Sequence, residues 1–205
     1  MNKEIAKILL DIKAVHLEPN NFFTWTSGIK SPIYCDNRQV ISYPEYRSFI
    51  INKFIELINS KYPQTEVIAG TATAGIPWAA WIADRMSLPM LYIRSSSKGH
   101  GLQNALEGKV EENKKVLVIE DLISTGKSSI AAAKEVKKAN LELLGVVTIF
   151  SYAFKKSELA FNENQIPYSP LCDLDTMLNF SKEEKLLTSE QIDIIKKWKT
   201  SIENN

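Results

Sequence analysis

The chain has 205 residues and a formal net charge of +1, with 44% hydrophobic and 24% charged residues. This composition is ordinary for a globular protein and excludes a disordered chain, which needs few apolar residues and a large net charge. A nearly neutral chain also argues against a nucleic-acid binder held by a broad basic surface. The length suits a single domain with a substantial core.

The sequence predicts neither a targeting segment nor a membrane span. Glu4, Lys7 and Asp11 interrupt the apolar residues near the N-terminus, whereas a signal peptide needs an unbroken apolar stretch. No run of about 18 apolar residues occurs, as a transmembrane helix would require. The two cysteines, Cys35 and Cys172, form no C-x-x-C pair and predict neither a disulfide framework nor a zinc site. We therefore expect a reducing, cytoplasmic location.

In chain order, amphipathic spacing first predicts a helix over about residues 2–15. Short strands around a Ser-Gly turn are expected over 22–38, and a helix follows Pro44. The pattern then changes to strand–turn–helix units. Strands are predicted at 67–70, 89–94, 116–119 and 145–150, with helices at 76–86 and about 127–139 and a mobile Ser- and Gly-rich loop at 95–109.

Apolar strands that alternate with helices predict an α/β fold, in which helices flank both faces of a parallel sheet. Right-handed crossovers place the strand-to-helix turns at one edge of that sheet, where ligands bind. The C-terminal part is expected to be helical, with capping boxes at residues 181–184 and 188–191. No linker divides the chain, so a single domain is expected over residues 1–205.

The most informative stretch is residues 116–129, Val-Leu-Val-Ile-Glu-Asp-Leu-Ile-Ser-Thr-Gly-Lys-Ser-Ser. An apolar strand runs into two carboxylates, Glu120 and Asp121, before a turn of Ser, Thr and Gly opens a helix. Such a turn points free backbone N–H groups at one spot, and the helix dipole adds positive potential there. The segment predicts a phosphate monoester site that includes Leu122, Ile123, Ser124, Thr125, Gly126, Lys127 and Ser128.

The run Gly126-Lys127-Ser128 looks like part of a P-loop, but that motif needs a glycine where this chain has Asp121. The carboxylates of Glu120 and Asp121 are better suited to accept hydrogen bonds from ribose hydroxyls. The segment thus predicts ribose binding beside 5′-phosphate binding. The alternative is a helix cap next to a solvated acid pair, although two carboxylates at a sheet edge are costly unless a ligand or partner offsets them.

A cationic loop follows the strand at 89–94. Arg94, Lys98 and His100 lie in a Ser- and Gly-rich segment that can close over a substrate. These cations could neutralise negative charge that grows on a leaving phosphate group. His100 could also donate a proton, because the ordinary pKa of histidine lies near neutrality. The alternative interpretation is a solvated surface loop.

Four segments together carry a resemblance to a known family. Residues 116–129 resemble the phosphoribosyl diphosphate signature of the type I phosphoribosyltransferases. Three others are similar to the N-terminal element, the pyrophosphate loop and the catalytic loop of orotate phosphoribosyltransferases. They are residues 23–34, Phe-Thr-Trp-Thr-Ser-Gly-Ile-Lys-Ser-Pro-Ile-Tyr, residues 70–77, Gly-Thr-Ala-Thr-Ala-Gly-Ile-Pro, and residues 94–101, Arg-Ser-Ser-Ser-Lys-Gly-His-Gly. The resemblance covers roughly residues 5–180.

The resemblance implies a Rossmann-like core over about residues 42–152 that binds phosphoribosyl diphosphate. A small hood would be formed by about residues 1–41 and part of the C-terminal helical region. The implied reaction transfers ribose 5-phosphate from phosphoribosyl diphosphate to orotate, giving orotidine 5′-monophosphate and diphosphate in pyrimidine synthesis. Mg²⁺ is expected to bind mainly through the substrate's diphosphate, without a protein cage.

The same resemblance implies a homodimer in which each catalytic loop closes over the neighbouring subunit's site. No nucleic acid or membrane is expected as a partner. Arg94, Lys98 and His100 would be the catalytic residues and would also contact phosphoribosyl diphosphate. Ser124 and Lys30 would contact orotate, although Lys30 could equally be a solvated turn lysine.

The chain departs from the family pattern at several positions. Many members carry lysines at the positions of Thr26 and Ala74, both facing pyrophosphate, so their absence places extra demand on Arg94, Lys98 and Mg²⁺. An arginine that contacts orotate in some members, shortly after the strand at 145–150, has no clear counterpart here. The base-side contacts are therefore less specified by the sequence than the phosphate side.

Two other functions remain open at the level of sequence. One is transfer to uracil or a purine by another type I phosphoribosyltransferase. The other is a regulator that binds phosphoribosyl diphosphate without chemistry, which would need a DNA-binding helix pair or a basic face. The first predicted helix carries Lys3, Lys7 and Lys13 against Glu4 and Asp11, too little positive charge for that role.

Overall fold

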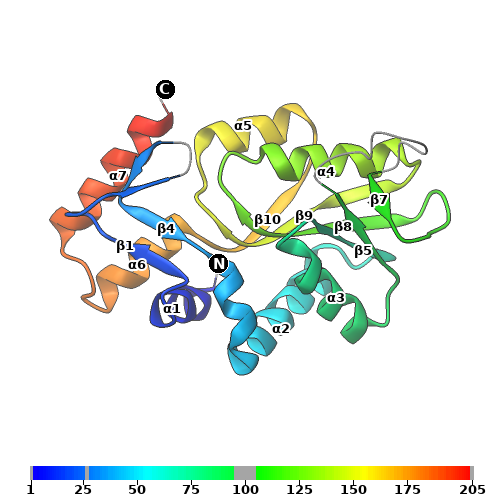
Figure 1. Cartoon of the computed structure of the whole chain (residues 1–205), viewed down its shortest axis with the longest axis horizontal. Helices are drawn as coiled ribbons and strands as arrows, with labels where there is room; N and C mark the ends of the chain where they lie inside the picture. Colours follow the sequence, from blue (N-terminus) through cyan, green and yellow to red (C-terminus); the bar gives the residue numbers. More distant parts are fainter. Residues whose placement is uncertain (1, 26–27, 95–104, 204–205) are drawn as a thin grey trace.

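The computed structural model describes residues 2–25, 28–94 and 105–203. Its centre is a six-stranded sheet in the order β10-β9-β8-β5-β6-β7 (Figure 1). Strand β7 pairs antiparallel with β6, while the other neighbouring strands run parallel. The predicted α/β fold with a parallel sheet is confirmed. The strands are β5 (Val67–Thr71), β6 (Met90–Ile93), β7 (Leu106–Glu107), β8 (Lys115–Ile123), β9 (Glu142–Ser151) and β10 (Tyr168–Asp173).

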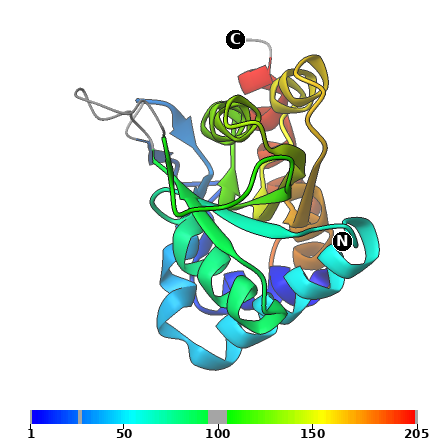
Figure 2. The ribbon, with the colours of Figure 1, turned by 90° about the vertical axis from the view of Figure 1, so that its right-hand side faces the viewer.

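Helices cover both faces of the sheet, as Figures 1 and 2 show. Helices α2 (Pro44–Lys61) and α3 (Gly75–Met86) lie on one face, and α4 (Lys127–Lys138) and α5 (Lys155–Glu163) on the other. The alternation of β8 explains this arrangement, because successive side chains point to opposite faces. Leu117 and Ile119 pack in the core that contains α2 and α3, whereas Val116 and Val118 pack in the core that contains α4.

The N-terminal region forms two small antiparallel pairs beside the main sheet. Strand β1 (Val15–Leu17) pairs with β4 (Ile33–Cys35), and β2 (Phe23–Thr24) pairs with β3 (Lys30–Ser31). The strands predicted over 22–38 are therefore confirmed. The first helix, α1 (Lys3–Asp11), is shorter than predicted, because the chain leaves the helix near Lys13, which has a φ of 57°, and enters β1.

Two boundaries near the predicted site differ from expectation. Strand β8 does not stop at Ile119 but runs through both carboxylates to Ile123, since it continues to pair with β9 as far as the Ile123–Ser151 pair. The loop predicted over 95–109 is wrong at its C-terminal end, where β7 pairs with β6. The carboxylates thus stand within the last residues of a strand, where ladder pairing holds their backbone.

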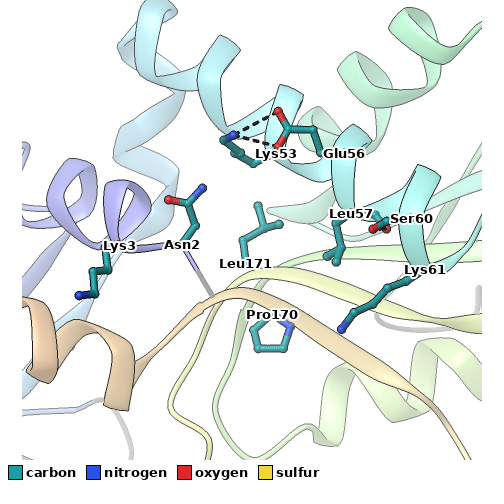
Figure 3. A pocket seen from close by; sticks show the side chains of 9 residues that line it. All are labelled: Asn2, Lys3, Lys53, Glu56, Leu57, Ser60, Lys61, Pro170 and Leu171. Carbon is teal, nitrogen blue, oxygen red and sulfur yellow. Dashed lines mark hydrogen bonds and ion pairs between the residues drawn. The ribbon is translucent and has the colours of Figure 1, made fainter.

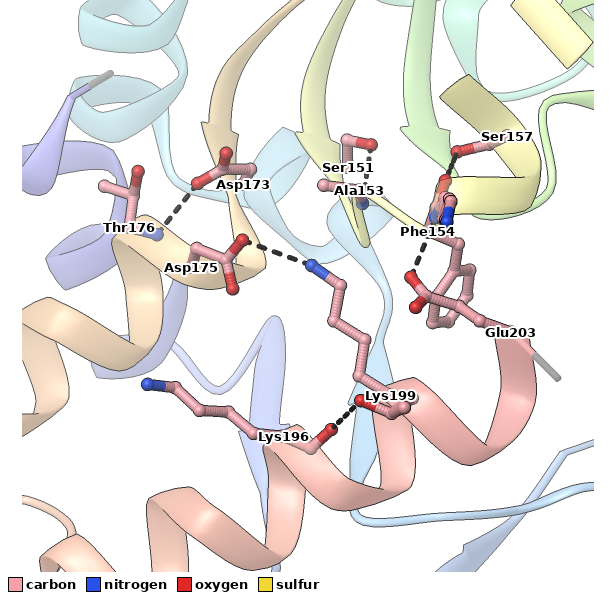
Figure 4. Close-up of polar contacts among 12 residues, drawn as sticks. Ser151, Ala153, Phe154, Ser157, Asp173, Asp175, Thr176, Lys196, Lys199 and Glu203 are labelled. Carbon is pink, nitrogen blue, oxygen red and sulfur yellow. Dashed lines mark hydrogen bonds and ion pairs between the residues drawn. The ribbon is translucent and has the colours of Figure 1, made fainter. Parts of the chain in front are cut away.

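The C-terminal region contains α6 (Leu174–Glu183) and α7 (Ser189–Glu203). Helix α6 is capped by Asp173, which accepts from the Thr176 N–H at 2.8 Å (Figure 4). Ser181 lies buried inside that helix, so the capping box predicted at 181–184 is wrong. The box at 188–191 is confirmed by reciprocal bonds of 2.9 and 3.2 Å between Thr188 and Gln191.

Both edges of the main sheet are short or covered. On β10, Pro170 has no N–H group to donate, and the carbonyl of Leu171 accepts from the Asn2 N–H at 3.0 Å. At the other edge β7 has only 2 residues. Among the described residues, no helix is long and apolar enough to span a membrane.

Candidate active site

The predicted site residues gather where the order of strands reverses. Strands β5 and β8 are neighbours, but the chain leaves β5 toward β6 on one side and leaves β8 toward β9 on the other. Ligands of open α/β sheets bind at such a switch point, beyond the carboxyl ends of the strands. Helices α3 and α4 both begin there, so two helix N-termini contribute positive potential to one region.

The predicted phosphate turn lies between β8 and α4. Gly126 is the N-cap of α4 with a φ of 77°, and it offers no side chain to accept from the first N–H groups of the helix. A Cβ on Gly126 would lie 2.7 Å from the Phe161 ring, so the turn requires glycine twice over. The N–H groups of the first turn, which starts at Lys127, are left for a ligand or water. The structure thus brings residues 124–128 together in one turn, and their binding of phosphate stays a prediction.

Of the two carboxylates, that of Glu120 is bonded to the first turn of α4. Glu120 is only 7% exposed, and its carboxylate accepts from the Asp121 N–H at 3.1 Å and from the Ser129 hydroxyl at 3.2 Å. Burial, followed by the charge of Asp121, raises the pKa of Glu120 to about 8. Burial likewise raises the pKa of Asp121. Hydroxyl donors or a cation brought here by a ligand would favour ionisation of both groups.

The predicted pyrophosphate loop follows β5 and opens α3. The Thr71 hydroxyl donates to the Ile119 carbonyl at 3.2 Å, which ties this loop to β8. Gly75 passes so close to β8 that a Cβ there would collide with the same carbonyl. The start of α3 and the carboxylates of β8 are therefore held within one compact unit.

Arg94 stands directly after β6, on the far side of β5 from the carboxylates. Its N–H donates to the Ala105 carbonyl at 2.8 Å, and its guanidinium pairs with Glu107 at 3.2 Å. Arg94 is therefore fixed at the point where the predicted catalytic loop leaves the sheet. The other two predicted catalytic residues, Lys98 and His100, lie outside the described residues, as does Thr26.

The predicted orotate contacts come from two segments that the fold connects. Lys30 lies in the β2–β3 hairpin, where its ammonium group donates to the Thr24 hydroxyl at 2.6 Å. From the same hairpin, the Trp25 ring packs on Tyr152 with centroids 5.4 Å apart. The Tyr152 N–H donates to the Ile123 carbonyl at 3.0 Å, immediately before Ser124. The hairpin and the phosphate turn are thus joined by this short series of contacts.

One buried residue beside the carboxylates was missed by the sequence reasoning. Asn37 is fully buried, and its side-chain amide donates to the Asp121 carbonyl at 2.7 Å. The run Asp36-Asn37-Arg38, polar residues directly after a strand, is the signal that could have indicated a structural turn. Its partner lies 84 residues away in the sequence, so no local pattern could have identified the contact.

Two hollows elsewhere on the molecule are not lined by the full set of predicted site residues. One of about 490 Å³ lies between α1, α2 and β10 (Figure 3), and none of the predicted site residues lines it. Its lysines Lys53 and Lys3 pair with Glu56 and Glu183. A second, of about 560 Å³, lies between α4 and α5 and touches the phosphate turn only at Thr125 and Lys127. In the described ranges, no group of three or more His, Cys, Asp or Glu residues could hold a metal ion.

Comparison with known proteins supplies the family. The phosphoribosyl transferase domain family matches residues 45–183. A protein named orotate phosphoribosyltransferase from Fusobacterium nucleatum is 52% identical over 204 residues, covering 98% of this chain and 97% of that protein. A protein of the same name from Staphylococcus aureus is 52% identical over 202 residues, covering 98% and 100%. The crystal structure of orotate phosphoribosyltransferase from Aeropyrum pernix superposes with a TM-score of 0.75 at 26% identity, covering 89% of this chain and 97% of that one. The chain belongs to the orotate phosphoribosyltransferase family, within the phosphoribosyl transferase domain proteins.

Proposed function

We propose that the chain transfers ribose 5-phosphate from phosphoribosyl diphosphate to orotate, producing orotidine 5′-monophosphate and diphosphate for pyrimidine synthesis. The observation that carries this proposal is the carboxylate pair of β8 followed by the turn that opens α4, at the switch point of the sheet. Relatives that share half of the residues along nearly the whole chain bear the name of this activity.

In this proposal the segment 120–128 binds the sugar donor. Glu120 and Asp121 accept hydrogen bonds from the ribose hydroxyls, and the turn residues Ser124, Thr125 and Ser128 bind the 5′-phosphate with backbone N–H groups and hydroxyls. The N1 atom of orotate forms a bond to C1 of the ribose while the bond from C1 to diphosphate breaks, and the proton that N1 loses passes to solvent or to the departing diphosphate. Positive charge then develops on the sugar and negative charge on the departing diphosphate, which takes the bonding electrons.

Arg94, Lys98 and His100 neutralise the charge that grows on diphosphate. One cation about 4 Å from a phosphate oxygen is worth on the order of 4 kcal/mol at an effective dielectric constant near 20. Contacts that strengthen in the transition state lower the barrier, whereas contacts of equal strength in the ground state do not. Closure of the loop that carries Lys98 and His100 would also keep water from attacking the sugar.

Mg²⁺ is the cofactor of this proposal. It prefers oxygen ligands and commonly binds through one or two carboxylates together with substrate phosphates. In this proposal Mg²⁺ binds mainly through the oxygens of the substrate's diphosphate, while Glu120 and Asp121 accept hydrogen bonds from the ribose hydroxyls. When bound to the diphosphate, Mg²⁺ would supply charge neutralisation of the leaving group.

The proposal extends to assembly, location and domain organisation. We infer a homodimer in which each catalytic loop completes the neighbouring subunit's site, in the cytoplasm, with orotate and phosphoribosyl diphosphate as the small-molecule partners. Both cysteines are free thiols, which suits a reducing compartment. About residues 1–41 and part of the C-terminal helices would act as a hood over the core of about residues 42–152.

The test is a spectrophotometric assay of the purified chain with orotate, phosphoribosyl diphosphate and Mg²⁺, following the loss of orotate absorbance. We expect turnover that needs all three components. Turnover with uracil or hypoxanthine but not with orotate would contradict the proposed base. Binding of phosphoribosyl diphosphate without turnover of any base would instead indicate a regulator.

A further inference from the structure

The junction between β4 (Ile33–Cys35) and the 3₁₀ helix η1 (Asn37–Ser42) contacts the backbone of β8 at Asp121. The side chain of Asn37 is fully buried, and the Asn37 Nδ2 donates to the Asp121 carbonyl oxygen at 2.7 Å. The Asn37 Oδ1 lies 3.4 Å from the Cys35 thiol, which donates to it. The Asn37 amide is therefore held from both ends and cannot rotate away without losing a buried hydrogen bond.

The contact falls where the sheet stops supporting β8 on one side. The last registered pair between β5 and β8 is Gly70 with Ile119, two residues before Asp121. Past that pair, β8 continues only along β9. The Asn37 amide thus supplies a hydrogen bond to β8 beyond the reach of β5.

The hydrogen bond from Asn37 holds more than the carbonyl oxygen of Asp121. Because the peptide unit is planar, holding the Asp121 carbonyl sets the orientation of the whole peptide between Asp121 and Leu122. That peptide determines how the Asp121 carboxylate is placed relative to the turn that follows. The neighbouring Arg38 adds a positive charge on the same junction, held by two bonds of 2.6 and 3.0 Å to the Asp36 carboxylate.

We propose that Asn37 is a positioning residue for the ribose site: through its hydrogen bond to the Asp121 carbonyl it holds the Asp121 carboxylate in register with the phosphate turn. This inference rests on the proposed binding of phosphoribosyl diphosphate by residues 120–128. It assigns to Asn37 no contact with substrate. It predicts a selective effect on the sugar donor, with little effect on orotate.

The test compares two variants of Asn37 with a matched control. Asn37→Asp keeps the size of the side chain and removes the donor, and Asn37→Ala removes the donor without adding charge. The control is Asn164→Asp at the end of α5, because the Asn164 amide also donates to a backbone carbonyl, that of Ala160, at 2.7 Å. The measurements are the KM for each substrate, kcat, the melting temperature, and the Kd of phosphoribosyl diphosphate by calorimetry.

We expect both Asn37 variants to raise the KM and Kd of phosphoribosyl diphosphate about five- to tenfold and to change the KM of orotate less than about twofold. The control Asn164→Asp should stay close to wild type in all of these measurements. Equal losses for both substrates, an unchanged donor KM, or failure of both variants to fold would overturn the proposal, since each would assign Asn37 to the fold alone. If the wild type binds the donor but does not convert orotate, the proposed reaction fails while the Kd comparison still decides the role of Asn37. If the wild type does not bind the donor, both proposals fall.

Discussion

At the scale of single residues, the molecule keeps two acidic side chains in a place where burial opposes their charge. Glu120 accepts from the Asp121 N–H and from the Ser129 hydroxyl, yet its pKa is raised to about 8 because desolvation outweighs these bonds. Residues held at a cost to stability are typical of binding and catalytic sites. The titration of Glu120 and the contacts of Asp121 can each be tested separately.

The raised pKa of Glu120 makes the stability of the fold depend on pH. A glutamate in an unfolded chain has a pKa near 4.5, whereas that of Glu120 in the folded protein is about 8. Between these values the folded state binds more protons than the unfolded state, so this group makes the free energy of unfolding fall as the pH rises from about 5 to about 8. Glu120→Gln cannot titrate and should flatten this dependence, measured by urea unfolding at several pH values. Glu163→Gln, on an exposed part of α5, is the control, and a slope unchanged in Glu120→Gln would refute the prediction.

We expect the Asp121 carboxylate to determine how well the sugar donor is used. Asp121→Asn replaces a charged acceptor with a neutral one, and a hydrogen bond to a charged group is worth about 1.5–3 kcal/mol. We expect kcat/KM for phosphoribosyl diphosphate to fall roughly tenfold to a hundredfold, with the fold retained in circular dichroism. Asp84→Asn, on the exposed side of α3, should behave as wild type. Normal activity of Asp121→Asn would show that this carboxylate does not bind ribose.

At the scale of elements, the start of α4 depends on a glycine that no other residue can replace without cost. Gly126→Ala would place a side chain in a left-handed conformation, at about 1–2 kcal/mol, and against the Phe161 ring. We expect a lower melting temperature and a large loss of affinity for the donor. Gly28→Ala separates the two causes, because Gly28 also has a positive φ but no atom within 4 Å of an added Cβ. If Gly126→Ala lost no more stability than Gly28→Ala, the contact with Phe161 would be unimportant.

The C-terminal helix α7 holds the hairpin that carries Lys30. The Trp198 indole N–H donates to the Lys30 carbonyl at 2.8 Å, and Lys199 pairs with Asp175 of α6 at 3.2 Å (Figure 4). Trp198→Phe removes this hydrogen bond, at about 1 kcal/mol, and replaces the indole that packs on Trp25 and Phe154 with a smaller ring. We expect a few-fold higher KM for orotate with an unchanged KM for the donor, measured by steady-state kinetics. Trp81→Phe, in the aromatic packing of α3, serves as the control, and an equal effect of both variants would argue against the role of α7.

The sequence predicts an element well when neighbouring residues determine it, and poorly when contacts between distant parts of the chain do. The apolar runs at 67–70, 116–119 and 145–150 specify buried strands by themselves, and the turn at 124–126 is indicated by its Ser, Thr and Gly. Strand β10 was not predicted, because Ser169 and Pro170 weaken its pattern, although a proline is tolerated at a sheet edge. The role of Asn37 was also missed, since it exists only once β4 and β8 have met.

At the scale of the whole molecule, the proposed dimer makes a prediction about mixtures. Lys98→Ala removes a loop cation and should lower kcat far more than it raises the KM for orotate, and Asp121→Asn damages the ribose site. If the loop of one subunit serves the site of its partner, a mixed dimer contains one site with both residues intact. Re-equilibrated mixtures of the two variants should then recover about a quarter of wild-type activity. Recovery no greater than the sum of the separate variants would show that each site is built within one subunit.

The edges of the central sheet bear on how the molecule behaves in a crowded solution. A long open edge presents a row of unpaired backbone donors and acceptors on which a second chain can pair indefinitely. Here Pro170 and the Asn2 contact interrupt that row on β10, and β7 is too short to offer one. Both edges of the sheet are therefore poor sites for adding a strand of another chain. Copies of the protein should associate through side-chain surfaces and not by extending the sheet into fibres.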